Sequence, residues 1–137
     1  MKVIKLYYSS IIFESDNYLD NSYLSNIVLK SVYKDYISAL AHCNIILCIN
    51  LSKDIIRIIK FSIKNYKESS KDITSKLNKN IMLKNIINSC DILTQSMMYT
   101  KEIFPINTRN NIITNLIDNG DKQINNILEY IKFILNK

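Results

Sequence analysis

The stretch that decides the fold is Ile81–Lys101, which reads IMLKNIINSCDILTQSMMYTK. Its apolar side chains recur at helical spacing and form a face, which Met82 and Ile92 widen on either side. The face consists of Leu83, Ile86, Ile87, Cys90, Leu93, Met97 and Met98. A helix that is apolar over most of its circumference usually lies among other helices. We therefore predict the central helix of a bundle, with Asp91 on its narrow polar edge.

The same spacing predicts helices before this segment. One covers Lys2–Phe13 and another runs from about Tyr23 to Ala41. The apolar stretch that continues to Ile49 is interpreted as buried helix, with a strand as the alternative. Ser52 is predicted to cap a further helix that runs to about residue 67, because serine accepts hydrogen bonds from free helix N–H groups. A short helix is expected around Asp72–Leu77.

Caps and breakers predict the end of the chain. Pro105 should end the central helix, and Thr108 should cap the next one. Gly120, the single glycine, lies where a left-handed residue would close that helix, and Asp121 should cap a last helix that reaches Leu135. The first of these two helices should bury Ile112, Ile113, Leu116 and Ile117. The expectation is an all-α bundle of six to seven helices around the central one.

Composition agrees with one helical domain over residues 1–137. Apolar residues make up 47% of the chain, enough for a core. One glycine and one proline are too few for the tight turns of a β-sandwich or barrel. Three cysteines are a sparse, odd set that favours a reducing compartment over a secreted disulfide scaffold. No apolar segment is long enough to span a bilayer, so we expect no membrane anchor.

The sequence offers little chemistry for catalysis or for cofactors. His42 is the single histidine, and beside Cys43 and Cys48 it lacks the four-ligand spacing of a structural zinc site. A single glycine excludes a glycine-rich phosphate loop. We expect no enzyme, no metal and no cofactor. The net charge is +6, but only Arg57 and Arg109 are arginines, so no nucleic-acid partner is expected and a solvated lysine surface is favoured.

Three segments carry a resemblance to a known family. The opening, MKVIKLYYSSIIFESDNYLDNSYLSNIVLKS (1–31), resembles the start of the small poxviral Bcl-2-like virulence proteins. The segment SKLNKNIMLKNIINSCDILTQSMM (75–98) is similar to the passage between their fourth and fifth helices. The ending, NTRNNIITNLIDNGDKQINNILEYIKFILNK (107–137), resembles the closing helices of vaccinia-type inhibitors of innate immune signalling. The Asn-Trp-Gly-Arg signature of cellular Bcl-2 proteins is absent, which argues against their way of binding pro-death helices.

The resemblance implies a Bcl-2-like bundle with two partner surfaces. One is a helix-binding groove, and it would lie at Ile27, Val32, Tyr36, Leu40, Ile59, Leu83 and Ile86. The other is a face for homodimers or for host signalling proteins, and it would lie near Lys5, Tyr8, Ile12, Thr108, Asn111 and Asn115.

The function that the resemblance implies is that of a viral modulator of innate immunity in the host cytoplasm. Such a protein inhibits NF-kappa-B signalling by protein–protein interaction. The alternative is an anti-apoptotic homologue that sequesters pro-death (BH3) helices in the groove.

Overall fold

The computed structural model of the chain describes residues 5–7, 10–12, 17–72 and 76–136. Within them are four long helices: α1 (Tyr18–Ala41), α2 (Ile45–Asp72), α3 (Lys76–Ile103) and α4 (Asn111–Leu135). A 3-10 turn, η1 (Ile106–Thr108), precedes α4. The prediction of an all-helical class is confirmed. The prediction of six to seven helices is wrong for three reasons. The last two expected helices are one continuous helix, α4, and the expected short helix at Asp72–Leu77 is divided between α2 and α3. The first expected helix is not formed in the described residues.

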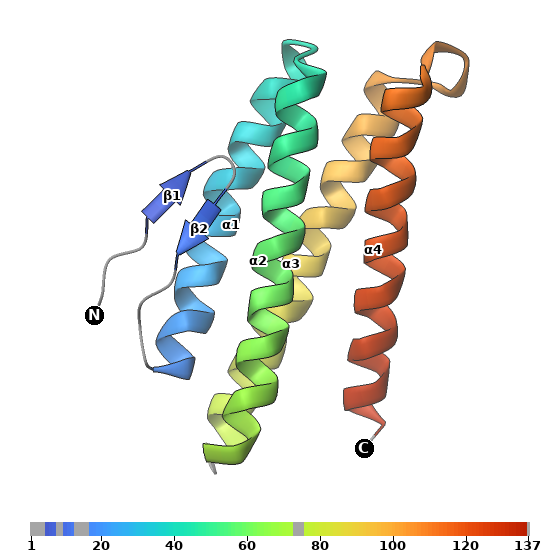
Figure 1. Cartoon of the computed structure of the whole chain (residues 1–137). Coiled ribbons are helices and arrows are strands. Elements are labelled where there is room, and N and C mark those ends of the chain that lie inside the picture. Colours follow the sequence, from blue (N-terminus) through green and yellow to red (C-terminus); the bar gives the residue numbers. More distant parts are fainter. Residues whose placement is uncertain (1–4, 8–9, 13–16, 73–75, 137) are drawn as a thin grey trace.

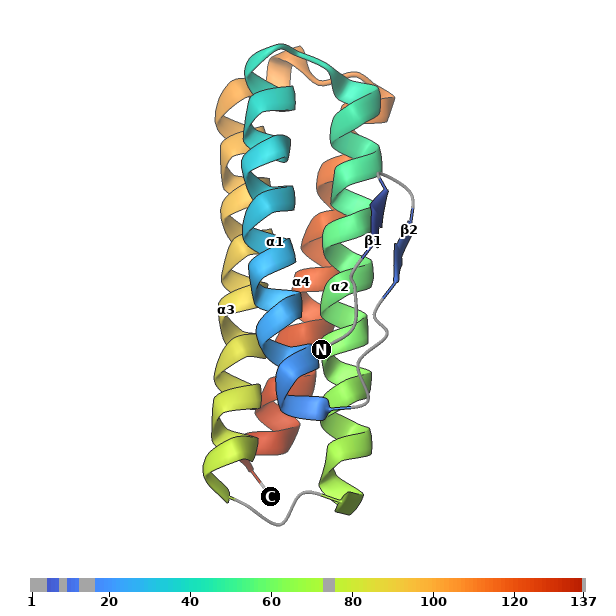
Figure 2. The ribbon, with the colours of Figure 1, turned by 90° about the vertical axis from the view of Figure 1, so that its left-hand side faces the viewer.

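The four helices run alternately up and down along a common direction (Figure 1). Helices α1 and α4 lie on opposite sides of the α2–α3 pair, and Figure 2 shows α1 in front and α4 behind. Both α2 and α3 pack against all three other helices. Helix α3 therefore shares the centre with α2, and its outer face, which includes Lys84, Asp91 and Gln95, is exposed. The predicted polar edge at Asp91 is confirmed, whereas the single central helix of a Bcl-2-like bundle is not present.

Core positions alternate at spacings of three and four residues, as expected where helices of a bundle pack side by side. In α4 this series comprises Ile113, Ile117, Gly120, Ile124, Ile127, Ile131 and Ile134. The most deeply buried core residues include Leu29, Tyr36, Ile55, Ile59 and Leu93. The apolar seams of all four helices therefore meet in one core, which joins residues of α1 to α4.

Polar residues replace apolar ones in the core at the end where α1 begins. Asn21 Nδ2 donates to Asn65 Oδ1 of α2 over 3.3 Å, and Asn65 Nδ2 donates to the Tyr18 carbonyl oxygen over 2.8 Å. Asn85 Nδ2 of α3 donates to Ser22 Oγ over 2.8 Å. These bonds link three helices and satisfy buried amides that would otherwise be costly. The apolar core is therefore concentrated toward the opposite half of the bundle.

Helix α2 begins earlier than predicted. Asn44 caps it, since its Oδ1 accepts from the Leu47 N–H over 3.2 Å. Residues 45–49 are helical, so the strand alternative is wrong, but residues 42–44 form a turn between α1 and α2. The stretch is not buried throughout, because Ile46 is 75% exposed. Ser52 lies inside α2 and not at its start, and its hydroxyl donates to the Ile49 carbonyl oxygen over 2.9 Å. A serine inside a helix can satisfy its hydroxyl in this way, so the residue type alone does not mark a cap.

The expected short helix at Asp72–Leu77 is also absent as a separate element. Asp72 is the last residue of α2, Leu77 belongs to the first turn of α3, and residues 73–75 lie outside the described ranges. The central prediction, helix over Ile81–Lys101, is confirmed within the longer α3. Helix α3 ends at Ile103, two residues before Pro105, as predicted.

Helix α4 runs without interruption through Gly120 and Asp121, so the predicted break there is wrong. Its N-cap is Asn110, whose Oδ1 accepts from the Ile113 N–H over 2.9 Å, and not Thr108. A Cβ on Gly120 would lie 2.7 Å from Cγ of Met97 on α3. The glycine therefore provides room for α3 to approach and does not terminate a helix.

The first predicted helix, Lys2–Phe13, is not observed where the structure describes it. Strands β1 (Lys5–Tyr7) and β2 (Ser10–Ile12) form an antiparallel pair in which residue 5 is opposite residue 12. Two consecutive isoleucines and a tyrosine within the pair favour extended backbone. The hairpin lies beside α2 (Figure 2). Within the described ranges, none of the helices combines the length and apolar character needed to cross a membrane.

Candidate protein-interaction groove

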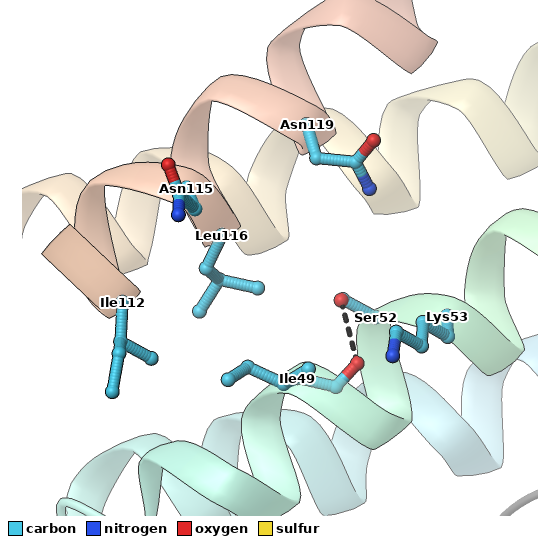
Figure 3. Close-up of a pocket in the computed structure, with 7 residues that line it drawn as sticks. All are labelled: Ile49, Ser52, Lys53, Ile112, Asn115, Leu116 and Asn119. Carbon is cyan, nitrogen blue, oxygen red and sulfur yellow. Dashed lines mark hydrogen bonds between the residues drawn. The ribbon is translucent and has the colours of Figure 1, made fainter.

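A groove opens between the N-terminal halves of α2 and α4 (Figure 3). It encloses a cavity of about 320 Å³. Helix α2 contributes Ile49, Ser52 and Lys53 to its walls, and α4 contributes Ile112, Asn115, Leu116 and Asn119. Isoleucine and leucine side chains point into the space between the two helices, and Lys53 and the two asparagines lie along it. The site therefore has an apolar floor and a polar rim.

Packing on the far side of α4 explains why this gap is not filled. Gly120 allows α4 to approach Met97 of α3 closely, which ties α4 to α3. On the α2 side, Ser52 is short, and its hydroxyl is turned back to its own helix. Asn115 and Asn119 are exposed, polar side chains that have little to gain by filling an apolar gap. The bundle is thus tight between α3 and α4 and open between α2 and α4.

Two exposed isoleucines border the groove. Ile112 lines it and is 55% exposed. Ile46 precedes Ile49 by three residues, so it lies on the same side of α2, and it is 75% exposed. Single exposed apolar side chains are normal on a protein surface, but a set that adjoins an apolar cavity is typical of interaction sites. The surface chemistry of this groove is suited to contact with another apolar side chain.

The predicted helix-binding groove is not a surface feature. Five of its seven residues are buried in the core of the bundle, namely Val32, Tyr36, Leu40, Ile59 and Ile86. The two remaining residues of the predicted set do not complete a groove, because Ile27 is exposed on α1 and Leu83 is half-buried on α3. Helical periodicity identifies residues that share a face, and in a four-helix bundle that face is the core itself.

The predicted partner face is divided between two sides of the molecule. The hairpin, which holds residues 5 and 12, lies on one side of α2, and α4 lies on the other (Figure 1). Tyr8 lies outside the described residues. Thr108, Asn111 and Asn115 are exposed around the start of α4, and Asn115 lines the groove. Only this last residue connects the predicted surfaces with the observed site.

Most residues of the groove were not predicted from the sequence. Ile112 was predicted to face inward with Ile113, Leu116 and Ile117, but it is more than half exposed. These four apolar residues span a wider part of the helix surface than one packed seam needs. The sequence therefore indicated that one of them would be exposed. Ile49 and Lys53 carried no comparable signal, because their role depends on where α4 lies.

Burial is the main cause of the shifted pKa values of two thiols and one carboxyl group among the described residues. Burial raises the pKa of the Cys48 thiol to about 11 and also raises the pKa of Cys90, so both thiols stay protonated at neutral pH. Asp54 is buried on α2 and pairs with Arg57; burial raises its pKa to about 6, and the guanidinium partly opposes the shift. Among the described side chains, no three His, Cys, Asp or Glu residues are placed to hold a metal ion.

No protein-family model, curated protein or solved structure matches the chain.

Proposed function

We propose that this protein acts by binding another protein in the groove between α2 and α4. The observation that carries the proposal is the position of Ile112, which is largely exposed and borders an apolar cavity of about 320 Å³. Because Ile112 is 55% exposed, burying the rest of its side chain in a partner stabilises a complex by about 1 kcal/mol, roughly half the value for a fully exposed isoleucine. The cavity also offers a pocket that an aliphatic or aromatic anchor of the partner can fill, as the main contacts of protein interfaces do.

The more specific proposal is inhibition of host NF-kappa-B signalling in the host cytoplasm by a viral protein. It rests on the sequence resemblance alone, because the four-helix arrangement differs from a Bcl-2-like bundle. In this proposal the chain occupies a host signalling component through the groove. No observation favours the alternative, sequestration of pro-death helices, since its predicted groove residues lie mostly in the core.

Two matched variants of α4 test the proposal. Ile112→Arg places a charge in the groove, whereas Leu128→Arg places the same charge on another face of α4, where Leu128 is 47% exposed. Tagged wild-type protein and both variants are expressed in host cells, and the retained proteins are quantified by mass spectrometry. We expect a partner that the wild type and Leu128→Arg retain and that Ile112→Arg loses. Equal retention by both variants would show that the groove is not the binding site.

The same variants separate the specific proposal from the general one. In a cell-based NF-kappa-B reporter assay, the wild type and Leu128→Arg should reduce the signal and Ile112→Arg should not. If none of the three proteins changes the reporter while the capture experiment still depends on Ile112, protein binding in the groove stands and the NF-kappa-B proposal is wrong.

A further inference from the structure

The structure also indicates which kind of partner segment the groove accepts. Building on the proposed function, we infer that the groove receives an acidic amphipathic helix of another protein. Its apolar side chains enter the cavity beside Ile112, and its carboxylates lie along a row of lysines on α2. Charge complementarity between that row and the partner carries this inference.

The lysine row consists of Lys53, Lys60 and Lys67, which are all exposed. They are seven residues apart, so they project from nearly the same side of α2 at intervals of about 10 Å. Lys53 lines the cavity, and Lys67 Nζ lies 4.8 Å from the ring centroid of Tyr130 on α4. The row therefore follows the α2–α4 seam from the groove toward the other end of the bundle.

The facing side of α4 offers no negative charge to these lysines. The residues that continue the groove side of this helix are Asn115, Asn119, Gln123, Asn126 and Tyr130. Asp121 pairs instead with Lys101 of α3 over 2.9 Å. Neither Lys53 nor Lys60 forms an ion pair with a described residue. Lys53 and Lys60 are therefore two like charges that no described carboxylate pairs with, and an acidic partner supplies that pairing.

The dimensions of the seam fit a helix. Lys53 and Lys67 are separated by 14 residues, which corresponds to about 21 Å along α2. A partner helix of about 14–20 residues with acidic side chains seven apart matches this length. A second copy of the chain is a poorer occupant, because its own groove would bring the same lysines face to face. Nucleic acid is also a poorer occupant, since the groove floor is aliphatic and the row contains no arginine.

A surface-displayed library of 21-residue amphipathic helices, with random charged or neutral residues on the polar face, tests the inference. The full-length protein is the bait, and the selected peptides are then measured by fluorescence anisotropy. We expect enrichment of Asp or Glu at seven-residue spacing and a loss of affinity of about tenfold or more for Lys53→Glu combined with Lys60→Glu. The control combines Lys30→Glu with Lys34→Glu on α1, which changes the net charge equally away from the groove.

The outcomes distinguish this inference from the proposed function. If the selected peptides carry neutral or basic residues and their binding is lost in Ile112→Arg, the groove is a binding site but its partner is not acidic. If the peptides bind Ile112→Arg as tightly as the wild type, or if the selection yields no binder, both the proposed function and the acidic partner are overturned. If the protein binds duplex DNA or anionic phospholipid vesicles tightly at physiological salt, and the Lys53→Glu, Lys60→Glu variant loses this binding, the lysine row binds phosphates instead. A dimer in light scattering that Ile112→Arg dissociates would make the second copy the occupant.

Discussion

For the replacement of Gly120 by alanine, packing and helix propensity predict opposite effects on the stability of the protein. Alanine is favoured over glycine inside a helix by about 1 kcal/mol, so propensity alone predicts that Gly120→Ala stabilises the protein. The new Cβ, however, would lie 2.7 Å from Cγ and 3.1 Å from Cε of Met97. Non-bonded carbon atoms prefer about 3.5–4.0 Å. Met97 is 1% exposed and belongs to the core cluster, so a shift of its side chain has to be accommodated by neighbouring core residues.

Overpacking of a core costs about 1–3 kcal/mol, which exceeds the gain in propensity. We therefore expect Gly120→Ala to lower the free energy of unfolding by about 1 kcal/mol, measured by urea denaturation. A double-mutant cycle with Met97→Ala provides the control. Met97→Ala alone should cost about 2–5 kcal/mol, and Gly120→Ala should become stabilising in that background because the clash is removed. If Gly120→Ala stabilises the wild-type protein by its full propensity gain, the close approach of α3 and α4 is wrong.

Three further predictions concern single residues of the bundle and are checked by chemical denaturation. Cys43 has a φ of 53° at the end of α1, a left-handed conformation that favours glycine, so Cys43→Gly should stabilise the protein by about 1 kcal/mol; a loss of stability would contradict this. Burial raises the pKa of Asp54 from 3.8 to about 6, so its ionisation weakens the fold as pH rises through 6. Asp54→Asn should then be more stable than wild type at pH 7, by up to about 3 kcal/mol, and equal to it near pH 4; a variant less stable at pH 7 would show that the Arg57 ion pair dominates. The hydroxyls of Tyr36 and Thr100 lie 2.6 Å apart, and Thr100 also donates to a backbone carbonyl. Thr100→Val should therefore cost more than Tyr36→Phe, because it leaves the buried tyrosine hydroxyl without an acceptor, and the reverse order would refute this arrangement.

Periodicity predicted the helices whose apolar seams are long. The sequence of α3 shows one helix over Ile81–Lys101 because Ile86, Leu93 and Met97 recur at core spacing, and all three are buried. The predicted end of α1 at about Ala41 is confirmed, whereas the helix begins at Tyr18, five residues before the predicted start at Tyr23. Local spacing contains this information, since each seam faces the core along its whole length.

Residues with two roles account for the errors in helix boundaries. Serine and glycine are common at helix ends, but Ser52 satisfies its hydroxyl within α2, and Gly120 accommodates Met97. The sequence does not distinguish a glycine that ends a helix from one that admits a neighbour. That distinction depends on which residue of another helix lies opposite, and it is a property of the packed bundle.

The groove could not be predicted from the sequence for a related reason. The exposure of Ile112 follows from the distance between α2 and α4, which the contact of Gly120 with Met97 helps to set on the other side of α4. The seven-residue spacing of Lys53, Lys60 and Lys67 was visible in the sequence. Without the position of α4, however, that row was indistinguishable from an ordinary solvated helix face.

Site-specific photo-crosslinking tests the central proposal, protein binding between α2 and α4, most directly. A photoreactive phenylalanine analogue is introduced at position 112 or, as the control, at position 128, and each protein is irradiated in the cells used for the capture experiment. We predict a discrete covalent adduct with a partner protein from position 112 and none from position 128. Adducts of equal yield from both positions, or an adduct from position 128 alone, would contradict the assignment of the groove as the binding site.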